Sequence, residues 1–351
     1  MENKLEKTVF VRDLKPKMEV DTVFFIKHLA KVEARDGKFY LDAVFSDASG
    51  SIQARKWQEI DRIFQYIRPG NYVRAKGKAN LYQNRLQLIV TTIERVDEKL
   101  IDPQEFIVRA RSNSETMYKK LLGLVENLDD IYIKNLLRNI LQDPEIVVRL
   151  KKWQAGKTIH HAYQGGLLEH ILSCAELAVL LSPLYSCNEN YVVAGAVLHD
   201  LCKIYEFTEG PLVEYTDKGK LVGHLVDGPE LVDRFTGNIP DFPDDTKMHL
   251  KHILLSHHGH LEYGSPKPPL TPEAYLVYLI DHLDSKMNSI LQIIERDMNM
   301  GQWTSLSKHL PQSLFKGRLP HYTRPRKEKP SISQFKNNSL AKQLEKFSVE
   351  Q

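Results

Sequence analysis

The sequence has few cysteines and no long hydrophobic run. Its 351 residues include three cysteines, Cys174, Cys187 and Cys202, without the paired spacing of zinc fingers. We expect reduced cysteines packed in the core. No apolar stretch approaches the ~20 residues of a bilayer-spanning helix, and the first residues, MENKLEKTVF, lack the apolar segment of a signal peptide. We therefore expect a cytoplasmic protein with no membrane part.

The net charge of +3 is unevenly distributed along the chain. Residues 1–100 carry 19 basic and 14 acidic side chains, residues 101–315 carry 20 and 28, and residues 316–351 carry 9 and 3. An acidic middle suits metal cations, and basic ends suit a polyanion such as nucleic acid. The alternative is that the basic ends are only solvated surface.

Residues 8–100 have the pattern of a small β-barrel. Turn-forming pairs such as Asp36-Gly37 and Gln83-Asn84 separate strand-like runs, and an amphipathic helix fits Glu59–Ile67. The expected strands are 20–32, 39–46, 51–57, 71–82 and 85–96. Five strands with a helix between the third and fourth are typical of the OB-fold, which binds single-stranded nucleic acid.

Nucleic-acid binding by such a barrel needs exposed aromatic rings, on which bases stack, and basic side chains that contact phosphates. The candidates are Phe39, Tyr40, Trp57 and Tyr82, with Arg55, Lys56, Arg74, Lys76 and Arg85. Strand alternation places Phe39 and Tyr40 on opposite faces, so we expect at least one of them in the core. A core role is the alternative for each aromatic side chain.

The rest of the chain is expected to be a linker, a helical domain and a tail. Residues 101–114 contain Asp-Pro and Ser-Asn-Ser and suit a linker, and the apolar period becomes helical from Glu115 onward. We expect a helical domain over 115–315, with apolar stripes that include Tyr118 to Leu128 and Ile131 to Leu141. Residues 316–351 are basic and poor in apolar residues, so we expect a disordered tail that attracts phosphates or is only solvated.

Histidines cluster in the helical part: 11 of the 14 lie between His160 and His282. His199-Asp200 ends the apolar run Tyr191–Leu201, and other candidates also lie on helix-like apolar segments, among them a helix over Lys218–Leu225. A lone histidine there is usually a hydrogen-bonded core residue, but five with two aspartates indicate a shared cation. The candidate ligands are His170, His199, Asp200, His224, His257, His258 and Asp281.

The ligand types indicate the metal and its chemistry. Neutral imidazoles with carboxylates suit Mn, Fe, Zn or Co rather than Mg or Ca. One carboxylate, for which Asp200 is the natural choice, can bridge two cations ~3.5–4 Å apart, and such a pair can activate a hydroxide for phosphoryl chemistry. We therefore expect two divalent transition-metal ions.

The ordered pattern H…HD…H…HH…D resembles that of the HD-domain phosphohydrolases, which are all-helical metal enzymes. The resemblance implies that one metal is bound by His170, His199, Asp200 and Asp281, and the other by Asp200, His224, His257 and His258. The segment HDLCK departs from the common HDxGK, with Cys202 in place of glycine. Lys203 is retained, and either contacts a substrate phosphate as a catalytic residue or forms a structural salt bridge.

The order of an OB-fold followed by an HD domain is similar to that of the YhaM-type 3′→5′ exoribonucleases. The motifs that carry this similarity are KTIHHAYQGGLLEH, HDLCK, SHHGHLEYGSPKPP and IDHLDSKMN. This similarity covers about residues 10–300 and implies Mn²⁺, single-stranded RNA as substrate and a homo-oligomer. Single-stranded DNA remains a second possible substrate. Two different functions also fit the sequence: hydrolysis of a small nucleotide, and non-catalytic binding of nucleic acid by a protein whose metal is structural.

Several residues near these motifs have no assigned role. The pair His160-His161 suits substrate contact, a helix cap or packing, and Asp284 either orients a ligand or pairs with Lys286. The turn Gly264-Ser265-Pro266 suits a pocket rim. We expect His252 and His260 at the surface or behind the ligands.

Overall fold

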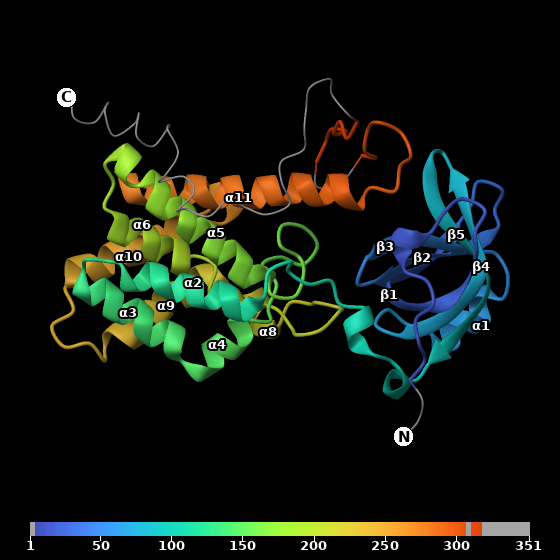
Figure 1. The fold of residues 1–351 in the computed structure, drawn as a ribbon, viewed down its shortest axis with the longest axis horizontal. Helices are drawn as coiled ribbons and strands as arrows, with labels where there is room; N and C mark the ends of the chain where they lie inside the picture. Colours follow the sequence, from blue (N-terminus) through green and yellow to red (C-terminus); the bar gives the residue numbers. More distant parts are fainter. Residues whose placement is uncertain (1–3, 307–309, 318–351) are drawn as a thin grey trace.

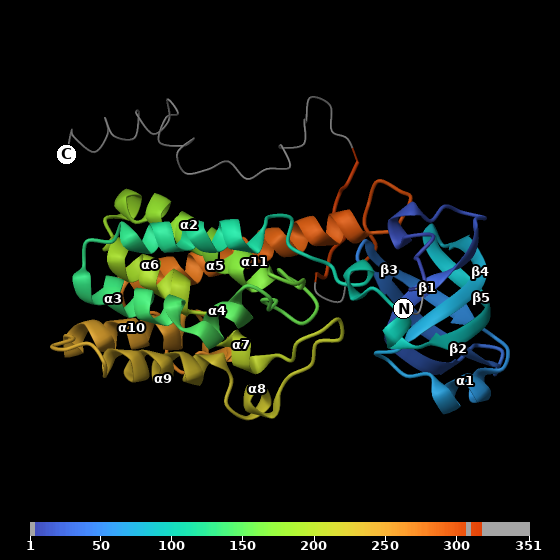
Figure 2. The same ribbon diagram turned by 60° about the horizontal axis from the view of Figure 1, so that its bottom comes forward.

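The computed structural model describes residues 4–306 and 310–317. A β-barrel lies at one end and a helical region at the other, and the long helix α11 extends from the helical region toward the barrel (Figures 1 and 2). The expected α+β architecture is therefore confirmed. The predicted tail lies outside the described residues from position 318 onward. Among the residues described, no helix is both long and apolar enough to cross a membrane.

The barrel is a closed five-stranded sheet with strand order β1-β2-β3-β5-β4. Neighbouring strands are antiparallel except β3 and β5, which are parallel. Its elements are β1 (Glu19–Glu33), β2 (Phe39–Asp47), β3 (Gly50–Lys56), α1 (Ile60–Tyr66), β4 (Tyr72–Tyr82) and β5 (Arg85–Val96). The five predicted strands and the helix between the third and fourth are all present.

Alternating side chains build the barrel interior. In β4, buried Val73, Ala75 and Ala79 alternate with exposed residues. Phe24 and Phe45 stack inside, with ring centroids 5.4 Å apart. Such alternation buries one side of each strand and leaves the other side to solvent, so the outer surface is free for a ligand.

The helical region surrounds a separate hydrophobic core. Its helices are α2 (Ser114–Glu126), α3 (Ile131–Gln142), α4 (Pro144–Leu150), α5 (Gly166–Leu181), α6 (Glu189–Leu198), α7 (Lys203–Glu206), α8 (Asp217–Leu221), α9 (His224–Thr236), α10 (Asp244–Ser256) and α11 (Pro272–Arg296). Side-chain caps begin several of them: Asn113 accepts from two backbone N–H groups of α2, and Asp130 does so for α3.

Helix α6 lies at the centre of this core and packs closely on two other helices. A Cβ added at Gly195 would lie 2.6 Å from Ile253 of α10 and 2.7 Å from Val277 of α11. Glycine therefore allows α10 and α11 to approach α6. This close packing brings the C-terminal ends of α6 and α10 beside the middle of α11, and candidate ligands from all three helices lie there.

Two segments connect the helical region to the barrel. In the predicted linker, Ile101 and Phe106 are buried against barrel residues, so the linker is packed rather than free. After α11, Met298 packs on the barrel core, and the backbone N–H of Met300 donates to the carbonyl of Asn84 in the β4–β5 turn. Residues 297–306 and 310–317 are not helical, so the helices end at Arg296.

Three local predictions were wrong. The helix expected over Lys218–Leu225 is interrupted, because Gly223 adopts φ 78° and ψ 162° and a new helix begins at His224. Ile131, placed in an apolar stripe, is 55% exposed because it is the first residue of α3. Cys174 and Cys202 are buried, but Cys187 is only half-buried; all three are free thiols.

Candidate metal centre

The seven predicted ligands come from five helices that meet at one place. His170 lies within α5, and Asp281 lies within α11. The other five lie at helix ends: His199 caps the C-terminus of α6 and precedes Asp200, His224 begins α9, and His257 and His258 follow α10. The structure therefore brings together residues that are spread over more than 100 positions.

Four of the seven form one group. His170 Nε2 lies 3.0 Å from His199 Nε2, 3.4 Å from Asp200 Oδ2 and 3.3 Å from Asp281 Oδ1. His199 Nε2 lies 3.7 Å from the same Asp200 oxygen. These atoms could coordinate one metal ion together.

A second group uses the other oxygen of Asp200. His224 Nε2 lies 3.4 Å from Asp200 Oδ1, and His257 Nε2 lies 3.7 Å from it. His258 Nε2 lies 3.3 Å from His224 Nε2. Asp200 thus directs Oδ2 to the first group and Oδ1 to the second, which is the arrangement of a carboxylate that bridges two cations.

The outer nitrogen of each of the five imidazoles already has a hydrogen-bond partner. His199 Nδ1 lies 2.9 Å from the Ala196 carbonyl, His257 Nδ1 lies 2.7 Å from the Leu254 carbonyl, and His258 Nδ1 lies 2.9 Å from the Tyr263 carbonyl. For the other two, the partners are carboxylates: Asp284 for His170 and Glu206 for His224. Each Nδ1 faces an acceptor and therefore carries the hydrogen.

The inner nitrogens consequently face one another with lone pairs. The Nε2 atoms of His170 and His199, 3.0 Å apart, repel each other unless a proton or a cation lies between them. His257 Nε2 is buried and has no hydrogen-bond partner among the described residues. Five Nε2 lone pairs and two carboxylates directed at one volume therefore fit divalent transition metals.

Two carboxylates lie behind the ligands, of which sequence reasoning missed Glu206 and left the role of Asp284 open. Glu206 is buried and accepts a 2.6 Å hydrogen bond from His224 Nδ1. Asp284, for which the sequence leaves open a ligand-orienting role or a pair with Lys286, accepts from His170 Nδ1 at 2.9 Å and lies 2.7 Å from His161 Nε2. Such partners fix the orientation of an imidazole ligand and raise its basicity. Asp284 could be suspected from the sequence because it lies three residues after Asp281 on the same helix. No pattern in the sequence pointed to Glu206.

Charges in the cluster are strongly perturbed. Burial lowers the pKa of His199 to about 3 and that of His258 to about 4, so both imidazoles are neutral at pH 7. Burial acts in the same direction on His170, but neighbouring groups that include Asp200, Asp281 and Asp284 outweigh it and raise the pKa of His170 well above its usual value. In the metal-free protein, His170 therefore holds a proton that a metal would displace.

Lys203 stabilises the bridging carboxylate. Its Nζ lies 2.7 Å from Asp200 Oδ2, and the two side chains are buried. Burial opposes ionisation of Asp200, but Lys203 and the surrounding imidazoles outweigh burial and hold the pKa of Asp200 well below its usual value. Asp200 is therefore a carboxylate at neutral pH.

The structure also shows the surroundings of the nearby residues to which the sequence assigns no role. His161 is fully buried and contacts Asp284, whereas α5 has Gly165 as its N-cap, so the helix-cap role is wrong. The turn at Gly264 follows Tyr263, whose carbonyl contacts His258, so this turn supports a ligand. His252 and His260 contact Leu270 and Tyr278, outside the cluster.

On the barrel, four of the predicted nucleic-acid-binding residues form an aromatic cluster. The rings of Tyr40 and Trp57 stack with centroids 6.1 Å apart. The guanidinium of Arg55 lies 5.3 Å from the Tyr40 ring and 5.8 Å from the Tyr82 ring. Arg85 pairs with Tyr82 across the β4–β5 turn. Tyr40, Arg55, Trp57 and Tyr82, which we call the aromatic cluster, lie on the outer face of the barrel, and Trp57 is 47% exposed.

The remaining barrel candidates lie elsewhere. Arg74 and Lys76 are on β4 and pair with Asp21 of β1 at 2.7 and 3.2 Å. Lys56 is buried, and its Nζ donates to the Thr91 carbonyl. The expectation that Phe39 or Tyr40 is in the core was wrong: Phe39 is 45% exposed and Tyr40 is half-buried.

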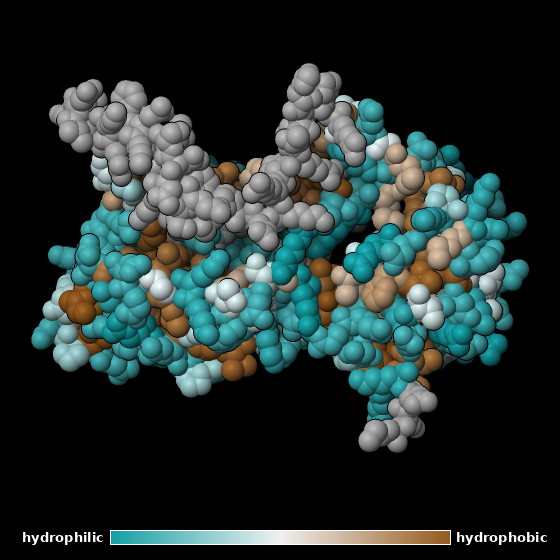
Figure 3. Space-filling model, in the orientation of Figure 1, coloured by the Kyte–Doolittle hydropathy of each residue, from teal (hydrophilic) through white to brown (hydrophobic). Residues whose placement is uncertain are grey.

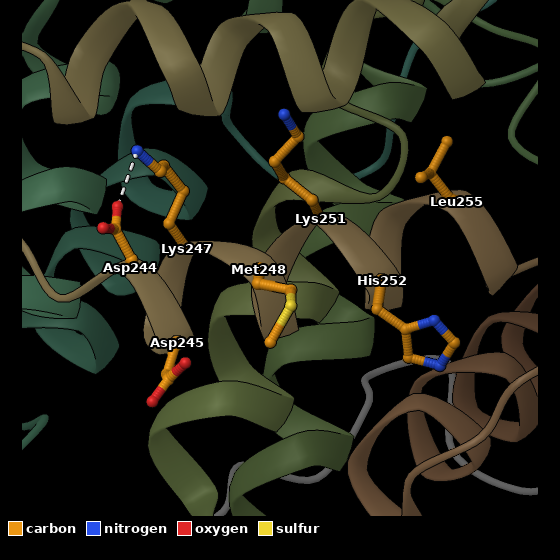
Figure 4. A pocket seen from close by; sticks show the side chains of 7 residues that line it. All are labelled: Asp244, Asp245, Lys247, Met248, Lys251, His252 and Leu255. Atoms are coloured by element: carbon orange, nitrogen blue, oxygen red, sulfur yellow. Dashed lines mark ion pairs between the residues drawn. The ribbon is translucent and has the colours of Figure 1, made fainter.

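A hollow on the outside of α10 is not part of this centre. Its lining side chains come from α10 and spread along the helix without converging on one point (Figure 4). Lys247 pairs there with Asp244 at 3.2 Å, and Lys251 pairs with Asp233 of α9. Its charges are thus largely paired.

Comparison with known families supports the two-part architecture. The HD domain family matches residues 167–286, and the OB-fold nucleic acid binding domain family matches residues 22–96. The chain therefore contains an OB-fold domain followed by an HD domain, as the sequence predicted. An HD domain indicates a metal-dependent phosphohydrolase.

Several solved structures are also similar to part of this chain. The second OB-fold domain of replication protein A from Methanococcus maripaludis is 16% identical, with 25% of this chain and 93% of that chain covered and a TM-score of 0.21. The mitochondrial single-stranded DNA binding protein Rim1 from S. cerevisiae is 15% identical, with 24% and 97% covered and a TM-score of 0.21. Hypothetical protein F20O9.120 from Arabidopsis thaliana is 14% identical, with 32% and 83% covered and a TM-score of 0.24.

Proposed function

We propose that this protein is a metal-dependent phosphodiesterase that degrades single-stranded nucleic acid, RNA in the first place, from the 3′ end. The observation that carries the proposal is the position of Asp200 between two groups of imidazoles whose Nε2 lone pairs converge. Phosphodiester hydrolysis is a reaction that a pair of bridged cations supports well. The barrel, with its exposed aromatic cluster, supports a polymeric substrate rather than a small one.

The ligand sets follow the two groups described above. One cation would be held by His170, His199, Asp200 and Asp281. The other would be held by Asp200, His224, His257 and His258. When bound, such cations activate water and offset the negative charge that develops on the phosphoryl oxygens. Mn²⁺ is our first choice of metal, from the resemblance to YhaM-type enzymes and from the mixed imidazole and carboxylate ligands, with Fe, Co and Zn next.

The chain's own residues prepare the site before substrate arrives. Lys203 holds Asp200 ionised, Asp284 orients His170, and Glu206 orients His224. The Asp281 side chain is 19% exposed, whereas those of His170 and His199 are fully buried. His258 is also partly exposed, so substrate would approach the centre past Asp281 and His258.

The barrel would bind the strand by stacking and by charge. Bases would stack on Tyr40, Trp57 and Tyr82, and Arg55 and Arg85 would contact phosphates. This mode tolerates any base sequence, as general degradation of single strands requires. The 3′→5′ direction and a homo-oligomeric state are proposed from the resemblance alone.

The test is degradation of 5′-labelled single-stranded RNA and DNA by the full-length protein, with Mn²⁺ and with chelator. We expect a ladder that shortens from the 3′ end with Mn²⁺, and none with chelator. Asp200→Ala should abolish it, whereas Asp129→Ala, at an exposed carboxylate of the same region, should not. Internal cuts, or intact RNA and DNA in every reaction, would contradict the proposal.

A further inference from the structure

A cleft of about 550 Å³ lies between the barrel and the helical region. The barrel contributes Lys27, His28 and Ser51 to its lining, and the helical side contributes parts of segments 152–164 and 208–214 together with Arg296. The space-filling view shows the surface drawn inward between these two regions (Figure 3). The cleft is thus formed only when both regions are in place.

The acidic side chains of this cleft are already neutralised. Glu209 pairs with Lys152 at 3.5 Å, and Glu214 pairs with Lys157 at 2.5 Å. These pairs leave no free carboxylate among the residues that line the cleft. Any remaining cation in the lining therefore gives the cleft a net positive charge.

Lys27 and Arg296 are the remaining cations. Neither side chain forms an ion pair or a hydrogen bond with another residue in the described part of the chain. Both reach solvent within the cleft, although protein surrounds each of them on most sides. Glu295, the neighbour of Arg296, is engaged by Arg111 at 2.5 Å. The cleft thus has two positive charges in excess, from opposite walls.

The position of Lys27 has a local cause in β1. The pairing of β1 with β2 shifts register between Ile26 and His28, so Lys27 is the extra residue of a β-bulge. Bulges turn a side chain out of the regular alternation and are frequent next to functional sites. Surrounding protein, and then the charge of Arg296, lower the pKa of Lys27 to about 8. Two cations that repel each other across a cleft are stabilised by an anion between them.

The cleft and the aromatic cluster share the outer face of one strand. Ser51, Gln53 and Arg55 alternate with buried residues along β3, so they share its outer face. Ser51 lines the cleft and Arg55 belongs to the aromatic cluster, which places the two about 13 Å apart along the strand.

On the helical side, one loop connects the cleft with the metal centre. Tyr163 lines the cleft, and its hydroxyl lies 3.0 Å from His161 Nδ1. His161 in turn contacts Asp284, which holds His170. One wall of the cleft is therefore three contacts away from a candidate metal ligand.

We propose that Lys27 and Arg296 bind backbone phosphates of a single nucleic-acid strand that passes from the aromatic cluster through this cleft toward the metal centre. The inference rests on the proposed function and adds the path of its substrate. A strand would supply the anion that the two cations lack, and would contact both regions at once. The cleft would thereby favour polymers over mononucleotides.

The experiment measures binding without turnover. Fluorescence anisotropy of a 5′-fluorescein 12-nucleotide RNA is followed in chelator with the full-length wild type, Lys27→Gln, Arg296→Gln and the double variant. We expect the double variant to bind about tenfold more weakly near 0.1 M salt, and the slope of log K against log[salt] to fall by about 1.4, since each phosphate contact on a single strand contributes about 0.7. Lys120→Gln, at an exposed lysine of α2, is the matched control and should bind like wild type.

The charge-preserving pair Lys27→Arg and Arg296→Lys should keep most of the affinity, and thermal unfolding of all variants shows whether they fold. Equal affinity and salt slope for the double variant and wild type would overturn the inference. Binding of AMP as tight as that of the 12-mer would also overturn it, in favour of a nucleotide site. Because chelator is present, dependence on Lys27 and Arg296 is measurable even if the protein lacks nuclease activity, so the two proposals fail separately.

Discussion

Glu206 and His224 form a 2.6 Å hydrogen bond, with Nδ1 of the imidazole donating to Oε2 of the carboxylate. Both side chains are buried, and the contact turns His224 Nε2 toward Asp200. A similar pair, Asp284 and His170, serves the other group of ligands. The metal affinity of each group of ligands can therefore be lowered separately by changing its own carboxylate partner.

Replacing Glu206 by Gln should weaken one metal site selectively. The amide keeps an acceptor for His224 but removes the negative charge, and changes at such partners usually cost 10–100-fold in metal affinity. We expect about one bound ion per chain at a Mn²⁺ concentration that fills both sites of the wild type, measured by elemental analysis after gel filtration. The control is Glu230→Gln, at an exposed carboxylate of α9. Wild-type metal content in Glu206→Gln would contradict the role assigned to this carboxylate.

Much of the fold could be predicted because its signals are local. Strand alternation and the turns at Asp36-Gly37 and Gln83-Asn84 indicate the barrel. The metal candidates could be predicted because imidazoles on apolar helices are costly without a partner. The partner Glu206 could not be predicted, because it reaches His224 through packing of α7 against α9 and not through spacing along one helix.

The barrel errors have the same origin. Alternation along β2 predicts on which face of the strand a ring lies, but it does not predict whether other residues cover that face. At least one of Phe39 and Tyr40 was therefore expected in the core, and neither ring lies there. Likewise, Arg74 and Arg55 each face an aspartate of a neighbouring strand, Asp21 at 2.7 Å and Asp42 at 3.7 Å, but Arg55 also lies beside two aromatic rings. Cross-strand partners decide such roles.

Trp57 should matter for strand binding. Loss of one base–aromatic stack costs about 1–3 kcal/mol, so Trp57→Ala should raise the dissociation constant for single-stranded RNA by about 5- to 150-fold in chelator. Tyr66→Ala is the matched control, because Tyr66 is an exposed aromatic residue of α1 outside the aromatic cluster. Equal affinity of the two variants would show that the aromatic cluster does not bind bases.

The metal-free protein should lose stability in mild acid. The pKa of His199 is about 3 and that of His258 about 4 in the fold, against about 6.5 in an unfolded chain. Between pH 6.5 and pH 4 the unfolded state therefore binds more protons, and the free energy of unfolding falls as the pH falls. The raised pKa of His170 affects the free energy of unfolding only above this pH range. Protonated His170 stabilises the fold fully below pH 6.5, and this contribution is lost as the pH rises further.

Urea denaturation of chelator-treated protein at pH 7 and pH 5 measures this effect, and a lower midpoint is expected at pH 5. His258→Gln should reduce the difference, since one of the two titrating imidazoles is gone. Mn²⁺ should raise the midpoint more at pH 7 than at pH 5, because protons compete for the imidazoles. An equal or higher midpoint at pH 5 in the metal-free wild type would show that these imidazoles are not held neutral.

Binding of single-stranded RNA should weaken as the pH rises through the titration of Lys27. Surrounding protein and Arg296 lower the pKa of Lys27 to about 8, and Asp47 opposes this shift. Below that pH the ammonium attracts a phosphate, and above it the charge is lost. The affinity measured in chelator should therefore fall between pH 7 and pH 9. Lys27→Arg should remove most of this pH dependence, because a guanidinium stays protonated throughout, and an unchanged pH profile in that variant would assign the titration to another group.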